Sequence, residues 1–278
     1  MLNELNSEIE EIEEILVGIA DVIGSLFQTH KELTLEIVDK LLTELLPKYF
    51  KPESTVFETK MGLFIVDDMI EFLGQDLLGK IWGDIAKLVV NYADNSSVPL
   101  RQAACYGIGE FAANTKSNFN LYSEEMLSAI YKAYQYNDDG VSKEAWGFCR
   151  DNITSALGKL IFYQSSHLSD LVTIINAYIT NMPLNFDVKQ SKLQHKLFVD
   201  CLINSPDYLV GNNKENLPKI IRILGKLYNS PYVSEETNLS IKNILENMKN
   251  NSSMTSFILA AKDGCAINIL QNLEEFFN

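Results

Sequence analysis

The chain has 278 residues, of which 46% are hydrophobic, and carries a net charge of −14 at pH 7. This composition is typical of a folded protein. The excess of acid argues against nucleic-acid binding, since lysine and arginine supply most of the affinity for phosphates, and it favours basic partners or simply solubility. No apolar run reaches membrane-spanning length and the acidic first residues do not resemble a signal peptide, so we expect neither membrane insertion nor secretion.

Apolar residues recur at helical spacing from the first helix onward, and no segment alternates as a β-strand would. In the first predicted helix, over residues 5–28, they are Ile9, Ile12, Leu16, Ile19, Ile23 and Leu26. Later helices are expected in pairs separated by turns rich in Pro, Gly, Asn and Ser. The pairs are 31–49 with 55–74, 75–93 with 98–114, 121–136 with 142–164, 167–181 with 186–204, and 213–228 with 234–249.

Two of these helices share a pattern in which a glycine follows an arginine by eight residues. The pattern runs from Arg101 to Gly109 and again from Arg150 to Gly158, with small residues between. Corresponding positions, separated by 46, 39 and 49 residues, are Gly24, Ile70, Gly109 and Gly158. HEAT and armadillo units repeat about every 40–47 residues, and such helix pairs bury their apolar faces by stacking on their neighbours.

The sequence therefore predicts an all-α HEAT-repeat solenoid, a right-handed superhelix of antiparallel helix pairs. We expect one array over residues 1–278, in which 5–28 is an unpaired second helix, 31–249 holds about five pairs, and 253–277 forms a C-terminal cap. Solenoids usually carry a polar cap at each end. Because this array opens on an unpaired helix, we expect the chain to be a C-terminal fragment of a longer protein.

Three segments carry a resemblance to a known family. They are 62–71 (GLFIVDDMIE), 101–109 (RQAACYGIG) and 209–220 (LVGNNKENLPKI). In this order and spacing they resemble the C-terminal HEAT-repeat region of the importin-β (karyopherin-β) superfamily. They are most similar to its importin-five, or karyopherin beta-three, branch. The resemblance covers roughly residues 5–250.

The resemblance implies a nuclear import receptor that shuttles between cytoplasm and nucleus through the nuclear pore. The implied partners are basic cargo proteins, nucleoporins with phenylalanine-glycine repeats, and Ran-GTP, the last bound mainly by N-terminal repeats outside this chain. Neither nucleic acid nor membrane insertion is implied. A HEAT scaffold of another class, such as a phosphatase scaffold subunit, is the alternative. It would predict near-uniform repeat lengths, whereas the lengths here differ.

In this family the second helix of each repeat lines the concave face. We therefore take as candidate cargo-facing residues the acids and one tryptophan on those helices, namely Glu58, Asp68, Glu71, Glu110, Glu144, Trp146 and Asp151. Acids would meet basic cargo, and an exposed tryptophan beside them would contact a lysine or arginine stem. Two alternatives stay open: the acids lie on a solvated face, and Trp146 packs between repeats.

Structural roles are predicted for the arginine and glycine positions of the repeats. Arg101 and Arg150 are expected to bond to turn acids of adjacent repeats, as in the HEAT ladder, and Gly109 and Gly158 to permit close helix packing. Grooves between neighbouring first helices are candidates for nucleoporin phenylalanines. The aromatic residues considered for the groove between helices 75–93 and 121–136 are Trp82, Tyr92, Tyr131 and Tyr134, with core packing as the alternative.

No pattern of residues indicates catalysis, and we predict that the chain is not an enzyme and uses no cofactor or metal. The histidines, His30, His167 and His195, pair with no serine or cysteine at a motif spacing, so helix-end or solvated positions are expected for them. The cysteines at 105, 149, 201 and 265 form no C-x-x-C pair, which argues against a zinc site or disulfide framework. Buried, inert thiols are expected instead.

Overall fold

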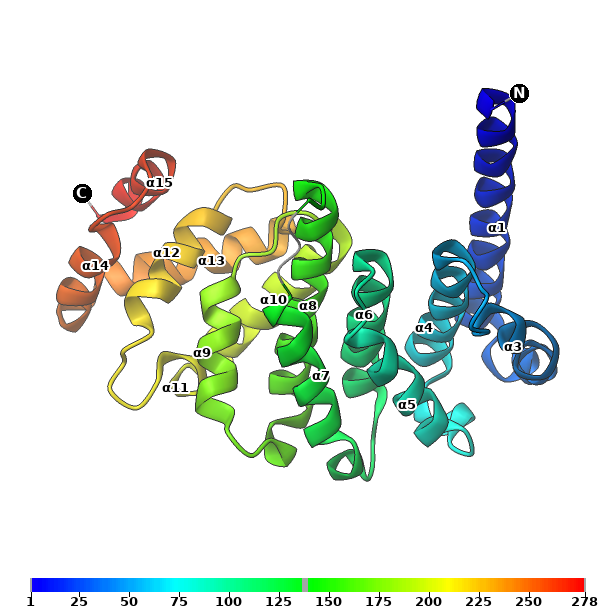
Figure 1. Cartoon of the computed structure of the whole chain (residues 1–278). Helices are drawn as coiled ribbons and strands as arrows, with labels where there is room; N and C mark the ends of the chain where they lie inside the picture. The colour runs from blue at the N-terminus through cyan, green and yellow to red at the C-terminus, as the bar shows by residue number, and fades with distance from the viewer. Residues whose placement is uncertain (1, 137–139, 278) are drawn as a thin grey trace. The chain divides into compact units, whose positions relative to one another are not determined.

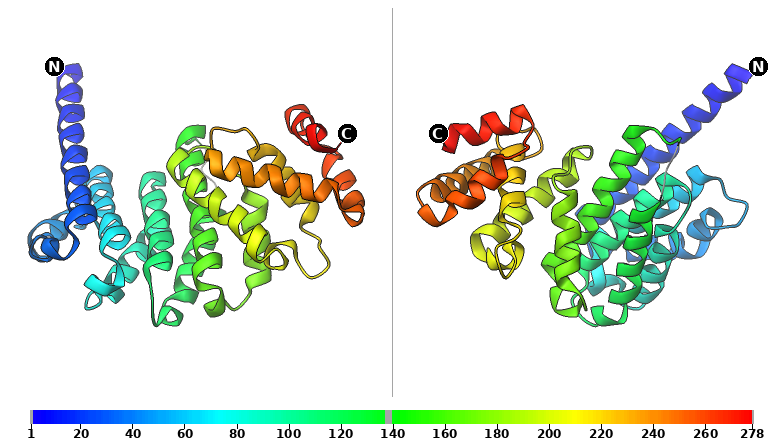
Figure 2. Two further views of the ribbon diagram at one scale, coloured as in Figure 1. Left: turned by 180° about the vertical axis from the view of Figure 1, so that it is seen from behind. Right: turned by 60° about the vertical axis from the view of Figure 1, so that its left-hand side comes forward.

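The computed structural model describes residues 2–136 and 140–277, and it divides into two compact units, Met1–Ala156 and Leu157–Asn278. Both units consist of helices joined by turns (Figures 1 and 2), and the described residues contain no β-strand. The predicted fold class, an all-α HEAT-repeat solenoid, is confirmed. Among the residues described, no helix is both long and apolar enough to cross a membrane.

The first unit is built from long helices, with an irregular stretch after the first of them. The long helices are α1 (Leu2–His30), α4 (Val56–Leu78), α5 (Trp82–Ala93), α6 (Val98–Asn114) and α7 (Ser123–Gln135), joined by the beginning of α8 (Lys143–Gln164). A short 3₁₀ turn, Phe119–Leu121, precedes α7. Helices α1, α4 and α6 lie side by side (Figure 1), α5 packs on α6, and α7 packs on α5.

The predicted helix 31–49 is irregular in the structure. It consists of a 3₁₀ turn (Lys31–Thr34), α2 (Leu35–Lys40), a π turn (Leu41–Leu45) and α3 (Leu46–Tyr49). Pro47 stands in the first turn of α3. Because proline has no N–H to donate to the preceding turn, a regular α-helix cannot run through this position.

The boundaries of α4 and α5 correct the predicted ones. Helix α4 begins at a capping box, in which Glu58 N donates to Thr55 Oγ1 (3.1 Å) and Thr55 N donates to the Glu58 carboxylate (2.7 Å). Gly74 has φ 63° and interrupts the helix at the predicted end, but one more turn follows, to Leu78. Helix α5 therefore begins at Trp82 instead of residue 75.

The second unit contains the rest of α8 and a set of shorter helices. These are α9 (Leu171–Asn181), α10 (Val188–Asn204), α11 (Asp207–Val210), α12 (Leu217–Leu227), α13 (Glu235–Lys249), α14 (Thr255–Lys262) and α15 (Ile267–Phe277), with 3₁₀ turns at Ser165–His167 and Ser252–Met254. Helix α11 was not predicted, and α12 begins four residues after the predicted start at 213. The segment 253–277 forms two helices, because Gly264, at φ 68°, lies in the turn between them.

Helices α14 and α15 are fixed to α12 by side chains that bond to exposed helix ends. Arg222 of α12 donates to the carbonyl oxygens of Ala260, Ala261 and Asp263, at distances of 2.7–2.8 Å. These carbonyls end α14 and have no partner within their own helix. Asn272 of α15 donates to the carbonyl of Gly225 at 2.9 Å. The last two helices are therefore packed parts of the second unit.

Candidate functional site

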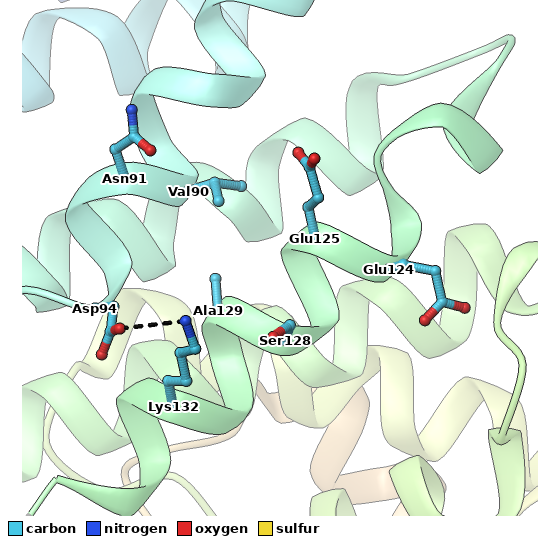
Figure 3. A pocket seen from close by; sticks show the side chains of 8 residues that line it. All are labelled: Val90, Asn91, Asp94, Glu124, Glu125, Ser128, Ala129 and Lys132. Carbon is cyan, nitrogen blue, oxygen red and sulfur yellow. Dashed lines mark ion pairs between the residues drawn. The ribbon is translucent and has the colours of Figure 1, made fainter.

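An open groove lies between α5 and α7, the first helices of two successive pairs. Its volume is about 570 Å³. The residues that line it are Val90 and Asn91 of α5, Asp94 directly after α5, and Glu124, Glu125, Ser128, Ala129 and Lys132 of α7 (Figure 3). Val90 and the buried Ala129 supply apolar surface, whereas the charged side chains around them are exposed.

The charges of the groove are arranged unevenly along α7. At one end Lys132 reaches across to Asp94, the C-cap residue of α5, with 3.4 Å between Nζ and Oδ2 (Figure 3). Toward the other end Glu124 and Glu125 stand in the first turn of α7, where they also complement the positive end of the helix dipole. Three carboxylates and one ammonium line the groove, so its field favours a cationic partner.

The groove forms between the two helices expected from the sequence, but the four aromatic residues considered for it do not line it. Trp82 is buried, stacked on Phe111 with 4.4 Å between ring centroids, and its Nε1 donates to Thr115 Oγ1 at 3.0 Å. Tyr92 packs against Phe50 instead. Tyr131 is half-buried and Tyr134 is exposed. For Trp82 the alternative of core packing holds, because burial of its large apolar ring stabilises the fold.

Two of the candidate acids, Glu71 and Glu110, meet around one tyrosine between α4 and α6. Tyr106 Oη of α6 donates to Glu71 Oε2 of α4 at 2.6 Å. Burial raises the pKa of Tyr106 far above its usual value, and the charges of Glu110 and Glu71 raise it further. Tyr106 therefore stays a neutral donor, and the two carboxylates lie close enough to act on the same group.

The other candidate acids lie apart from this pair. Glu58 forms the capping box of α4, and its hydrogen bonds to Thr55 lower its pKa. Asp68 packs on α1, where a Cβ at Gly24 would overlap its carboxylate. Glu144 is exposed in the first turn of α8, and Asp151 is buried. The structure thus brings two of the six acids together, and the cargo-facing role of each stays a prediction.

Arg101 connects its own turn to the next helix pair. The side chain is fully buried, and Nη1 donates to the carbonyls of Asn95 (2.6 Å) and Ser96 (3.3 Å). The guanidinium carbon lies 4.2 Å from the ring centroid of Tyr136 and 5.9 Å from that of Trp146. Trp146 is half-buried, so its ring contacts an internal cation, an interaction that reaches about 2 kcal/mol when desolvated.

The second arginine-to-glycine copy places its residues differently. Arg150 is exposed, in contrast to Arg101. At Gly158 an added Cβ would overlap the amide of Gln194 and lie 2.8 Å from Tyr178 Cε2, so α8 approaches α9 and α10 closely there. Gly109 is buried.

A close approach that sequence reasoning missed lies at Gly107 of α6. A Cβ there would overlap the carboxylate of Asp67 and lie 2.9 Å from Val89 Cγ1. The signal available in the sequence was a second glycine two residues before Gly109, inside a helix where glycine is costly. Among the described residues, no group of three or more His, Cys, Asp or Glu side chains could hold a metal ion.

Comparison with known proteins gives two informative matches. The chain is 27% identical to a probable importin-5 homolog of Dictyostelium discoideum over 188 residues, which cover 65% of this chain and 17% of that protein. It is 23% identical to importin-4 of Homo sapiens over 136 residues, which cover 45% of this chain and 12% of that protein. These matches support membership of the chain in the importin-β superfamily. No family model matches the sequence.

The segments that carry the importin-β resemblance occupy distinct places in the structure. Segment 62–71 lies in α4 and segment 101–109 in α6, so the two face each other in the closely packed pair of second helices. Segment 209–220 covers the end of α11, an ordered turn and the start of α12. The chain spans less than a fifth of the length of either importin relative.

Proposed function

We propose that this chain is part of a nuclear transport receptor that binds basic protein cargo or nucleoporins and works with Ran-GTP. Such a receptor shuttles between cytoplasm and nucleus. The observation that carries the proposal is the open, net acidic groove between α5 and α7 in a chain of the importin-β superfamily. The names of the two relatives, importin-5 homolog and importin-4, support transport over an unrelated scaffold role.

The geometry of the groove suits an extended basic segment. Val90 and Ala129 offer apolar contact for aliphatic stems, while Glu124 and Glu125 offer two exposed carboxylates for their charged ends. Lysine and arginine bury their stems along apolar surface and keep the head group in contact with polar partners. Each exposed ion pair contributes only about 0–1 kcal/mol, so measurable binding requires several contacts along the groove.

We further propose that both units belong to one HEAT array within a longer receptor. We also propose that the paired acids Glu71 and Glu110, with Glu58, Asp68, Glu144, Trp146 and Asp151, contribute to a cargo-facing surface on the second helices. Glu144 is exposed and Glu71 is half-buried, so these two can contact a partner directly, whereas Glu110 and Asp151 are buried. Mass analysis of the native polypeptide tests the first proposal, and substitution of Glu71 and Glu144 in the titration below tests the second.

A fluorescence titration tests the receptor proposal directly. The whole chain is titrated with a lysine-rich nuclear localisation peptide and with a scrambled peptide of the same composition, each at low and at physiological salt. We expect saturable binding that prefers the true signal and persists at physiological salt. Equal binding of both peptides that fades with salt would contradict the proposal, because a diffuse field is screened beyond about 8 Å at 0.15 M. A phenylalanine-glycine peptide in the same assay tests the nucleoporin contact.

Paired variants locate the binding in the groove. Replacing Glu124 and Glu125 together by glutamine should weaken binding of the basic peptide about two- to tenfold, from the loss of two exposed ion pairs. The matched control replaces Glu235 and Glu236, two exposed acids in the first turn of α13. Both changes remove the same charge from a helix start. Equal losses in both variants would show that net charge, and not the groove, binds the peptide.

A further inference from the structure

A smaller pocket lies in the second unit, between α9 and the turn that precedes α12. Its volume is about 220 Å³. One wall is apolar and consists of Leu171, Val172 and Ile175 of α9, with Tyr208 of α11 beside them. Val172 is 61% exposed, a large value for an apolar side chain. The pocket therefore offers apolar contact to a group that enters from solvent.

The opposite wall carries negative charge. Two exposed carboxylates, Asp207 and Glu215, line it together with the amides of Asn212 and Asn216, and Asn176 adds a third amide from α9. No lysine, arginine or histidine is among the lining residues. A cation is thus the charge that this wall complements, and an anionic ligand would be repelled.

The turn that carries Glu215 is held in place by its own hydrogen bonds. Asn216 N donates to the carbonyl of Val210 and its Nδ2 donates to that of Leu209, both at 3.1 Å. Gly211 has φ 81°, and Glu215 packs against it so closely that a Cβ there would lie 2.5 Å from Glu215 Cδ. Glu215 Oε2 also accepts from Asn213 N at 3.0 Å. The carboxylate is therefore positioned before any ligand arrives, which lowers the entropic cost of binding.

We propose that this pocket binds the side chain of an arginine in an extended segment of a partner protein. The aliphatic stem would lie along Leu171, Val172 and Ile175, and the guanidinium would reach Asp207 and Glu215. Arginine fits better than lysine, because its planar group presents five donors to several acceptors and also stacks on an aromatic face such as Tyr208. A phenylalanine would leave two carboxylates facing an apolar ring.

The start of α9 adjoins the pocket and does not cancel its negative field. Leu171 and Val172 are the first residues of that helix, whose N-terminus carries a partial positive charge. Asp170 caps this end by accepting from Thr173 N at 3.2 Å, and these hydrogen bonds to Thr173 lower the pKa of its carboxyl. The inference does not depend on the proposed transport function, because it involves neither the groove between α5 and α7 nor any cargo.

A nuclear magnetic resonance titration of the whole, isotope-labelled chain tests the inference. The probes are three capped pentapeptides, Gly-Gly-X-Gly-Gly, in which X is arginine, citrulline or lysine. Citrulline has nearly the shape of arginine without its charge. We expect arginine to shift the backbone signals of Val172, Tyr208 and Asn212 at lower concentration than lysine, and citrulline to leave them unchanged. Equal shifts with citrulline, shifts spread over the whole chain, or equal affinity for lysine would overturn the assignment.

Variants of the two carboxylates sharpen the same test. Asp207→Asn and Glu215→Gln should each weaken arginine binding about two- to fivefold, the range for one exposed ion pair. Glu215→Gln keeps a side-chain oxygen for Asn213 N, and an unchanged Gly211 signal would show that the turn persists. Glu235→Gln, outside the pocket, is the charge-matched control. Wild-type affinity in both pocket variants, or the same loss in the control, would refute the proposal.

Discussion

Helices α6 and α10 are both largely enclosed by their neighbours, yet they bury different kinds of polar group. Helix α6 buries the charged side chains of Arg101 and Glu110. Helix α10 buries neutral or neutralised groups, which are Gln190, Ser191, Gln194 and His195. Since a buried charge must be paired and a buried neutral group must only be hydrogen-bonded, the two helices depend on different conditions.

The difference predicts two kinds of sensitivity. In the first unit, removing a charge leaves acceptors of the neighbouring turn without their donor. In the second unit, protonating a buried group that has to stay neutral breaks its hydrogen bonds and destabilises the fold. Lys159 is a buried charge in the second unit, and its Nζ donates to Gln190 Oε1 of α10 at 3.3 Å, so a buried neutral amide is one of the groups that accept from it.

The largest effect is expected for Arg101→Ala. The substitution removes the donor to the carbonyls of Asn95 and Ser96 and the cation beside Tyr136 and Trp146. We expect a loss of about 3–5 kcal/mol in the free energy of unfolding, from acceptors left without this donor and from lost cation–π contact. Urea unfolding followed by circular dichroism measures it. Arg150→Ala is the control, because an exposed side chain should change stability by no more than about 0.5 kcal/mol.

This pair of variants can also refute the contrast. If Arg150→Ala destabilised the chain as much as Arg101→Ala, the shared arginine-to-glycine spacing, and not burial, would determine the energetic role. If neither variant changed stability, the buried guanidinium would be offset by its own desolvation, as happens for some buried ion pairs.

The next largest effect is a pH dependence that involves His195 of α10. Nε2 accepts from Leu184 N at 3.1 Å, so Nδ1 must carry the proton that is donated to the carbonyl of Tyr232 at 2.9 Å. Burial lowers the pKa of His195 to about 4, although the bond to Tyr232 opposes this. The unfolded chain, with a pKa of 6.5, binds the proton more readily. Stability is therefore complete above pH 6.5 and decreases, by up to about 3 kcal/mol, as the pH falls toward 4.

Chemical denaturation at a series of pH values between 7 and 4 measures this slope. The control is His195→Gln, which retains an acceptor and a donor but does not titrate. We expect its stability to vary much less over this window, even where its absolute stability is lower. Parallel curves for the two proteins would show that other groups cause the slope.

A smaller effect is expected for Gly158→Ala. The new Cβ would overlap the Gln194 amide, which cannot move freely because its Nε2 donates to Tyr178 Oη at 3.0 Å and the residue is fully buried. Overpacking of this kind costs about 1–3 kcal/mol, more than the roughly 1 kcal/mol that alanine gains over glycine in a helix. Gly18→Ala is the control, since nothing beyond the adjoining backbone of its own helix lies within 4 Å of its added Cβ. Thermal unfolding should show a lower midpoint for the first variant and an equal or higher one for the second.

The sequence predicts the helices of this fold better than it predicts the points where they break. Apolar periodicity located most helices, because it depends on a face several turns long. The interruption of α4 at Gly74 and the turn at Gly264 each depend on one glycine with positive φ. Tertiary packing decides whether a glycine adopts that conformation. The irregular turn before α3 has a local cause in Pro47, whereas the break at Lys31, with φ 37°, lies too far along the chain to be due to this proline.

The location of the candidate groove could be predicted from the sequence, but the residues that line it could not. Successive first helices of stacked pairs are neighbours, so a groove between α5 and α7 followed from the repeat. Its lining did not, because apolar residues at helical spacing do not reveal which of them, such as Trp82, faces the core and which, such as Val90, faces the neighbouring first helix. The resemblance directed attention to acids such as Glu71, while the carboxylates Asp207 and Glu215 come together only through the turn before α12.

The smallest effect is expected for Tyr106→Phe in α6. The change removes the donor to Glu71 Oε2 and keeps the ring. Glu71 is half-buried and can regain water, so the expected loss is about 1 kcal/mol, below that for Arg101→Ala. Tyr134→Phe, at an exposed tyrosine, should change stability by less than about 0.5 kcal/mol. Urea unfolding of both variants decides the point: a loss for Tyr106→Phe as large as for Arg101→Ala would mean that α6 is anchored equally by its hydroxyl and its guanidinium. The contrast with α10 would then concern hydrogen bonding in general and not charge.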